Sequence, residues 1–141
     1  MAPIREILLL HHSHLDVGYT HSQPVVWELQ REFIDQALQL LEETSGWPLP
    51  SQPSWTCEVT EPVLRWMAGA SSADVERLKR FIRAGRLGIS AMQYNTSTLC
   101  SAELLGRQLA PARVLRDSLG ARISTVIQHD INGIPCRFRI S

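Results

Sequence analysis

The sequence contains no long apolar run and no excess of charge of either sign. None of its apolar stretches approaches the roughly 20 residues that a membrane-spanning helix needs, which excludes an integral membrane protein. The 14 basic and 14 acidic side chains cancel to a formal net charge of +0, so there is no global signal for nucleic-acid binding. Internal repeats and low-complexity tracts are also absent. We therefore expect neither a membrane nor a nucleic acid as a partner.

Cysteine is scarce. The three cysteines, Cys57, Cys100 and Cys136, are odd in number and share no short metal-binding spacing, which is typical of free thiols in a reducing compartment. The apolar stretch before His11 is only four residues long, too short for a signal peptide. These features predict a cytoplasmic protein.

Length and composition are otherwise ordinary. The 141 residues, 44% hydrophobic and 20% charged, suit one folded domain or a part of one. The charges are unevenly spread, with nine acids and two bases up to Pro62 and five acids and twelve bases after it. The arginine-rich second half could bind a polyanion, but solvated helix faces are the commoner cause and the interpretation we favour.

Apolar periodicity predicts strands and helices that alternate along the chain. The expected strands are Ile7–Leu10, Trp55–Val59, Leu87–Met92 and Arg122–Ile127. The expected helices are a long one capped by Ser22, a short one over Glu61–Met67, and two capped by Ser71 and Ser101 that end at Gly85 and Gly120. This order is typical of right-handed βαβ units, so the predicted fold class is α/β with a parallel sheet. An open α/β domain and part of a barrel-like fold both remain consistent with it.

In parallel α/β folds the chemistry gathers at the carboxyl ends of the strands, and here each expected strand is followed by polar residues. After the first strand, His12, His14 and Asp16 alternate, so an extended backbone turns them to one side. Neutral imidazole and ionised carboxylate are ligands for a divalent metal such as zinc. A single histidine would more often bond to backbone, but the His-x-Asp pattern favours a metal site. Gly18 is expected to relieve the backbone at the following turn.

The remaining strand ends supply further candidates. Asp130 is either a turn-forming or capping residue, or a carboxylate that ligates the metal, attacks the substrate, or does both. Trp55, Glu58, Tyr94 and Asn95 are candidate substrate-binding residues, offering an aromatic ring for a sugar and polar contacts. For these four, structural roles are equally consistent with the sequence.

The segment His12–Thr20 resembles the opening motif of the glycoside hydrolase family 38 α-mannosidases, which is His-x-His-x-Asp-x-Gly-aromatic. The later segments Trp55–Glu58, Gln93–Thr96 and Asp130–Gly133 also follow in the family's order. The resemblance extends from Ile4 to about Pro135.

This resemblance implies a retaining α-mannosidase with a seven-stranded α/β barrel-like catalytic domain and one Zn²⁺. By the family's motif, His14 and Asp16 would ligate zinc, and Asp130 would be both a ligand and the catalytic nucleophile. The family's remaining histidine ligand and its general acid would lie beyond Ser141. Residues 1–135 would form the N-terminal part of the catalytic domain, and residues 136–141 a divergent tail.

The leading hypothesis is therefore an N-terminal segment of an enzyme that hydrolyses terminal α-mannosides, with the segment itself inactive. One alternative is a metal-dependent carbohydrate deacetylase, in which activated water would replace Asp130 as nucleophile. Another is a non-catalytic remnant that serves as a binding module. A homo-oligomer is left open.

Overall fold

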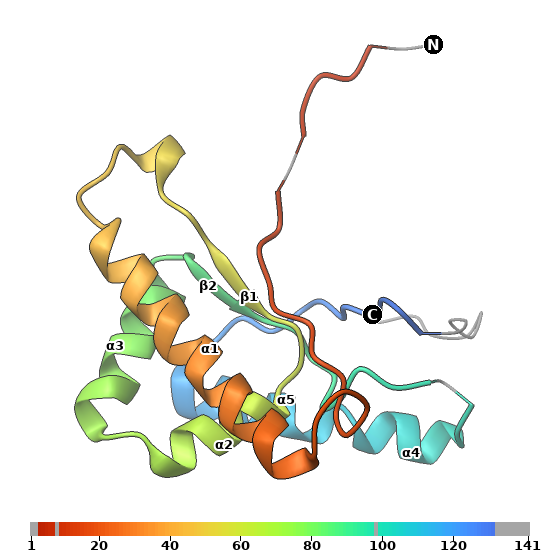
Figure 1. The fold of residues 1–141 in the computed structure, drawn as a ribbon. Coiled ribbons are helices and arrows are strands. Elements are labelled where there is room, and N and C mark those ends of the chain that lie inside the picture. Colours follow the sequence, from red (N-terminus) through yellow and green to blue (C-terminus); the bar gives the residue numbers. More distant parts are fainter. Residues whose placement is uncertain (1–2, 8, 98, 132–141) are drawn as a thin grey trace.

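Two short parallel strands lie at the centre of the structure, a computed structural model that describes residues 3–7, 9–97 and 99–131 (Figure 1). Strand β1 (Trp55–Cys57) pairs with β2 (Leu87–Ile89), with Trp55 opposite Leu87 and Cys57 opposite Ile89. The helices are α1 (Gln23–Glu43), α2 (Glu61–Gly69), α3 (Ser72–Arg83), α4 (Ala102–Arg107) and α5 (Ala110–Leu119), with a 3-10 turn at Leu49–Ser51. The fold is thus mixed α/β. None of the helices described could cross a membrane.

Helix α1 confirms the long helix predicted after Ser22. Pro24 is tolerated in its first turn, where the missing N–H has no helical partner anyway. The buried face recurs every three to four residues, and its members are Val26, Ile34, Ala37, Leu38 and Leu41. The apolar spacing of the sequence, Val26, Leu29, Phe33, Ala37, Leu40 and Leu41, predicts that Leu40 lies on this face; that is wrong, because Leu40 is exposed beside it.

The helix predicted after Ser71 is confirmed as α3. The Ser71 side chain accepts a hydrogen bond from the backbone N–H of Asp74, and Gly85 follows the helix with a φ of +70°. The single helix predicted from Ser101 to Gly120 is wrong in one respect, since it is divided into α4 and α5. Pro111 explains the division, because its ring lacks an N–H and would clash with the carbonyl of Arg107, where α4 ends.

The hydrophobic core lies between the sheet and the helices. Helix α1 packs against α2 and α3, and α5 contacts α2 (Figure 1). The largest aromatic side chain in the core is Trp66, 3% exposed, whose indole Nε1 donates to Asp35 Oδ1 at 2.7 Å. The other buried members of the cluster are Ile34, Leu38, Leu41, Cys57, Val63, Leu78, Phe81, Leu87, Ile89, Leu115, Leu119 and Ala121.

The first predicted strand, Ile7–Leu10, is not a strand in the structure. Ile7, Leu9 and Leu10 are exposed on a segment that extends away from the body of the protein (Figure 1); residue 8 lies outside the described residues. The segment joins the sheet only where His12 forms an isolated parallel bridge to Thr56. An apolar run becomes a buried strand only when other elements cover it, and in the described part of the chain nothing covers this one.

The fourth predicted strand, Arg122–Ile127, is also wrong. The segment runs beside the end of β2, where the Ala91 N–H donates to the Thr125 carbonyl at 2.9 Å. The Ile127 N–H, however, donates to the Ser90 hydroxyl rather than to a backbone carbonyl. A side chain thus takes the place of a ladder partner, so β-branched residues alone do not produce a strand here. The other two strands are confirmed but end before Val59 and Met92.

Cys57 and Cys100 should differ sharply in reactivity. Burial raises the pKa of the Cys57 thiol to about 12, whereas Cys100 is partly exposed. Because the thiolate is the attacking species, Cys57 in a Cys100→Ser, Cys136→Ser variant should react with an alkylating reagent only after denaturant is added. The matched control, Cys57→Ser with Cys136→Ser, should be labelled at Cys100 without denaturant. Equal labelling rates in the two folded variants would contradict the burial of Cys57.

Candidate functional site

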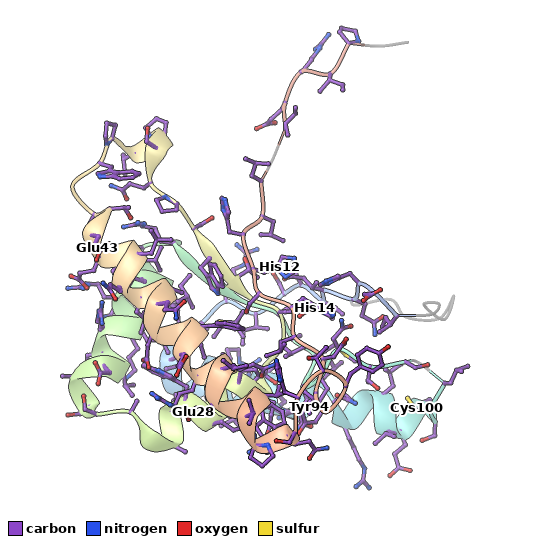
Figure 2. All side chains as sticks on the ribbon, in the orientation of Figure 1. His12, His14, Glu28, Glu43, Tyr94 and Cys100 are labelled. Carbon is purple, nitrogen blue, oxygen red and sulfur yellow. The ribbon has the colours of Figure 1, made fainter. Side chains whose placement is uncertain are left out.

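A cleft of about 600 Å³ opens where the N-terminal segment passes the end of β1. All four polar segments expected at the strand ends contribute to it, even though two of the preceding segments are not strands. In Figure 2, His12 and His14 lie on the N-terminal segment and Tyr94 lies in the same region of the molecule. The lining residues are His14, Leu15, Asp16, Val17, Tyr19, Trp27, Gln30, Glu58, Val59, Tyr94, Asn95, Thr96, Gln108 and Asp130.

The predicted metal ligands come together at one side of this cleft. His14 Nε2 lies 3.5 Å from Asp16 Oδ1 and 3.9 Å from Asp130 Oδ2. The same nitrogen is buried and has no hydrogen-bond partner. Such an imidazole nitrogen between two carboxylates is a donor set that suits a divalent cation. His14, Asp16 and Asp130 are therefore of the right chemical types for a metal ion, although among the described residues the group whose possible ligand atoms all lie within 4.8 Å of one another is His12, Glu58 and His129.

Glu58 lies on the other side of the His14 ring. His14 Nδ1 is 3.0 Å from Glu58 Oε1 and 3.1 Å from Oε2, while Asn95 Nδ2 donates to Oε1 at 3.0 Å. Glu58 is 7% exposed and is the only buried acid among the described residues. A buried carboxylate without partners would be costly, and these contacts reduce that cost.

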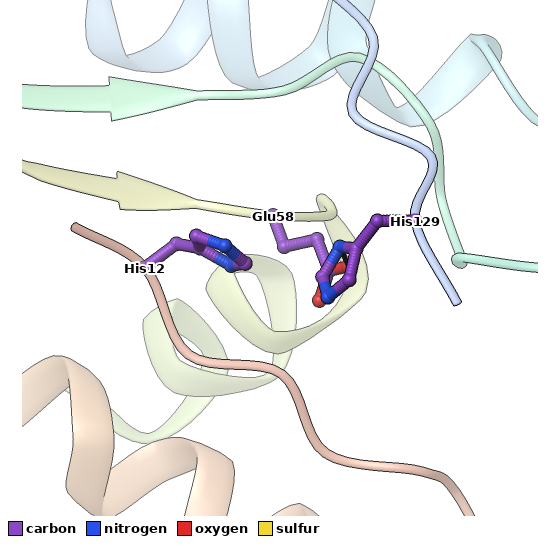
Figure 3. Close-up of side chains that lie close together, drawn as sticks. All are labelled: His12, Glu58 and His129. Carbon is purple, nitrogen blue, oxygen red and sulfur yellow. Dashed lines mark ion pairs between the residues drawn. The ribbon is translucent and has the colours of Figure 1, made fainter. Parts of the chain in front are cut away.

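A second histidine cluster shares the same carboxylate. His12, Glu58 and His129 place possible ligand atoms within 4.8 Å of one another, and Figure 3 shows the three side chains converging from separate segments. His129 Nδ1 lies 2.9 Å from Glu58 Oε1. The His129 ring is also 4.9 Å from the His12 ring and 4.2 Å from the His14 ring, centroid to centroid. Three imidazoles therefore surround one carboxylate.

Two backbone features shape the rim of the cleft. Asp130 has a φ of +56°, a left-handed conformation uncommon outside glycine, and its side chain is 78% exposed. The preceding carbonyl, that of His129, accepts a hydrogen bond of 2.7 Å from Asn95 Nδ2. Gly18 has a φ of +82°, which confirms that it relieves the backbone at the turn after Asp16.

The lining of the cleft also includes aromatic rings. Tyr94 and Trp27 lie with ring centroids 6.3 Å apart, and the Arg65 guanidinium is 4.1 Å from the Trp27 ring centroid. Burial raises the pKa of Tyr94, and the charge of Glu61 raises it further, so the hydroxyl stays protonated near neutral pH. Aromatic rings of this kind can stack against an apolar face of a ligand, while the carboxylates of the lining offer charge.

The structure does not bring every candidate to the cleft. Trp55 is half-buried against the core and lines a different, smaller hollow. Trp27 was not predicted as a site residue, yet it lines the cleft from the first turns of α1. A large aromatic ring outside the apolar stripe of an amphipathic helix is a signal that could have identified it.

Comparison with known proteins gives one family. The model of the glycosyl hydrolases family 38 N-terminal domain matches residues 5–138. Two solved structures from Enterococcus faecalis are similar at 20% identity each: a protein in glycosyl hydrolase family 38, with a TM-score of 0.62 over 81% of this chain, and an alpha-mannosidase from strain V583, with a TM-score of 0.66 over 82%. No curated protein matches.

The matched region is a small part of those two proteins. The chain covers 13% of the first and 12% of the second. At this identity the likeness is one of fold.

Proposed function

Since the chain belongs to glycosyl hydrolase family 38, we propose that it forms the N-terminal part of the catalytic domain of a zinc-dependent retaining α-mannosidase. On this proposal residues 1–135 belong to a seven-stranded barrel-like domain, and residues 136–141 are a divergent tail. The described residues contain two parallel strands, which would be part of that sheet, and the tail lies outside the described residues. The substrate would be a carbohydrate with a terminal α-mannoside.

The observation that carries the proposal is the convergence of His14, Asp16 and Asp130. These residues would hold Zn²⁺, with the unpartnered Nε2 of His14 as the nitrogen donor. Zinc, when bound, supplies positive charge that attracts and orients sugar hydroxyls. Tyr94 and Trp27 would stack against the sugar, and Asn95 lines the same cleft next to Glu58.

In the reaction, the Asp130 carboxylate would attack the anomeric carbon of the mannoside. The bond from that carbon to the leaving oxygen breaks, the oxygen takes a proton from a carboxylic acid, and water later hydrolyses the mannosyl–Asp130 ester. Asp130 suits this role because its carboxylate is exposed to the cleft beside His14. A retaining mechanism needs its second carboxyl group about 5–5.5 Å away. Glu58 is a poor candidate for that acid because it is buried behind His14.

The nucleophile can be tested separately from the acid. A mannosyl fluoride with a ring fluorine releases fluoride, which needs little protonation, so its attack depends mainly on the nucleophile. With zinc present, mass spectrometry should find the fluorosugar bound to Asp130, whereas an aryl α-mannoside with a poor leaving group should not turn over. Asp130→Asn should abolish labelling and Asp117→Asn should not, because Asp117 is an exposed side chain on α5 outside the cleft. Labelling elsewhere, or none, would contradict the assignment of Asp130.

A metal-dependent deacetylase remains the second candidate, because a cation held by His14 and Asp16 could serve either chemistry. A deacetylase would release acetate from an acetylated sugar and would leave Asp130 unlabelled by the fluorosugar.

A further inference from the structure

Glu58 is buried beside the proposed metal site. Its carboxylate contacts His14 Nδ1, whereas Asp16 and Asp130 lie near the other ring nitrogen, Nε2. We propose that Glu58 is a positioning residue, which keeps the proton of His14 on Nδ1 and so leaves Nε2 free to bind a cation. Asn95 completes this role by linking Glu58 to the backbone that precedes Asp130. The inference rests on the proposed function for the identity of the cation, but its first premise concerns the metal-free protein.

The contacts define which ring nitrogen of His14 carries the proton. A carboxylate only accepts hydrogen bonds, so His14 Nδ1, at 3.0 and 3.1 Å from the two Glu58 oxygens, must be the donor. In a neutral imidazole the other nitrogen, Nε2, then carries the lone pair. That nitrogen is the one that lies near Asp16 and Asp130 and has no hydrogen-bond partner. A carboxylate that fixes the tautomer in this way also strengthens imidazole as a ligand.

Asn95 extends the arrangement to the segment that precedes Asp130. Its Nδ2 donates both to Glu58 Oε1, at 3.0 Å, and to the His129 carbonyl, at 2.7 Å. The His129 carbonyl belongs to the peptide unit that enters the left-handed conformation of Asp130. One buried carboxylate and one amide therefore fix the ring of His14 and the backbone before Asp130 relative to each other.

The same geometry argues against His12, Glu58 and His129 as the main cation site. Glu58 already accepts hydrogen bonds from His14 and Asn95. A cation on its oxygens would compete with both donors and release the His14 ring. His12 Nδ1 and His129 Nδ1 are also buried without a hydrogen-bond partner, so an ion bound by this cluster is the competing arrangement, which the His12→Ala and Asp16→Asn variants distinguish.

The first test is the tautomer of His14 in metal-free protein. Long-range proton–nitrogen NMR in mildly alkaline buffer should show the proton on Nδ1 in the wild type. Glu58→Gln preserves shape and removes the charge, so the preference for Nδ1 should weaken or disappear, whereas Glu61→Gln, a matched acid outside the cleft lining, should leave it unchanged. A wild-type His14 with its proton on Nε2 would overturn the inference.

The second test is zinc affinity, measured by competition with a chromogenic chelator. Glu58→Gln should bind zinc about 10- to 100-fold more weakly than wild type, the usual effect of removing the partner of a ligating histidine. Asn95→Leu, which removes the donor to Glu58 and to the His129 carbonyl, should also weaken binding, and Glu61→Gln should not. Unchanged affinity in Glu58→Gln would overturn the inference. If the wild type binds no zinc, the proposed zinc chemistry fails, while the tautomer measurement still decides the role of Glu58.

Discussion

Replacing His14 with alanine is expected to abolish zinc binding, with a larger effect than the roughly 10- to 100-fold loss that follows removal of an outer partner. The substitution removes Nε2, the buried nitrogen that lies between the carboxylates of Asp16 and Asp130. The two carboxylates that remain, those of Asp16 and Asp130, are both exposed. Water hydrates exposed carboxylates, so they bind a cation more weakly than a site that includes a buried nitrogen ligand. Isothermal titration with zinc, before and after dialysis against a chelator, measures this loss.

Further variants identify which residues hold the ion. Asp16→Asn should also lose most of the affinity, because an amide is a much weaker ligand than a carboxylate. His21→Ala serves as the matched control, since His21 is exposed on the same loop and lies outside the cleft. If His12→Ala removes binding and Asp16→Asn does not, the cation site is instead His12, Glu58 and His129.

Replacing Trp66 with alanine is expected to lower the free energy of unfolding by about 3–5 kcal/mol. Trp66 is 3% exposed in the core, so its loss removes buried apolar area and leaves a cavity. The hydrogen bond from its indole to Asp35 is lost as well, although Asp35 keeps its ion pair with Arg31. Since a domain has a total stability of only about 5–15 kcal/mol, this change would leave little of it. Urea denaturation followed by circular dichroism measures the effect.

A matched tryptophan isolates the contribution of burial. Trp47 is 54% exposed, so Trp47→Ala should change stability by no more than about 0.5 kcal/mol. Trp66→Phe should fall between the two, because it keeps most of the ring and loses the indole donor. A loss below about 1 kcal/mol in Trp66→Ala would mean that the core does not depend on this side chain.

The helices could be predicted from the sequence because their signals are local. The Ser71 cap, Gly85 and the periodic apolar face of α1 each act within a few residues, and the structure has all three. Pro111 was available as a signal too, and only its position inside a longer apolar pattern concealed the break between α4 and α5.

The strands were harder to predict because pairing is decided elsewhere in the molecule. The β-branched run Arg122–Ile127 and the apolar run Ile7–Leu10 have the composition of strands, but neither has a ladder in the described part of the chain. The strand-end rule still brought His14, Asp16, Glu58, Asn95 and Asp130 into one cleft. It could not predict that Glu58 is buried while Asp16 and Asp130 are exposed, because the burial of Glu58 depends on residues from three separate segments.

The single bridge between His12 and Thr56 has a consequence for local stability. Exposed segments with few hydrogen bonds open at almost no free-energy cost, whereas the core elements open only with the whole domain. The backbone amides of residues 4–7 should therefore be among the fastest to exchange with deuterium, and those in the middle of α1 among the slowest. The boundary between fast-exchanging and slow-exchanging amides should fall at His12, two residues before His14. Events that pull on the N-terminal segment would thus be transmitted directly to the backbone that carries the proposed metal ligands.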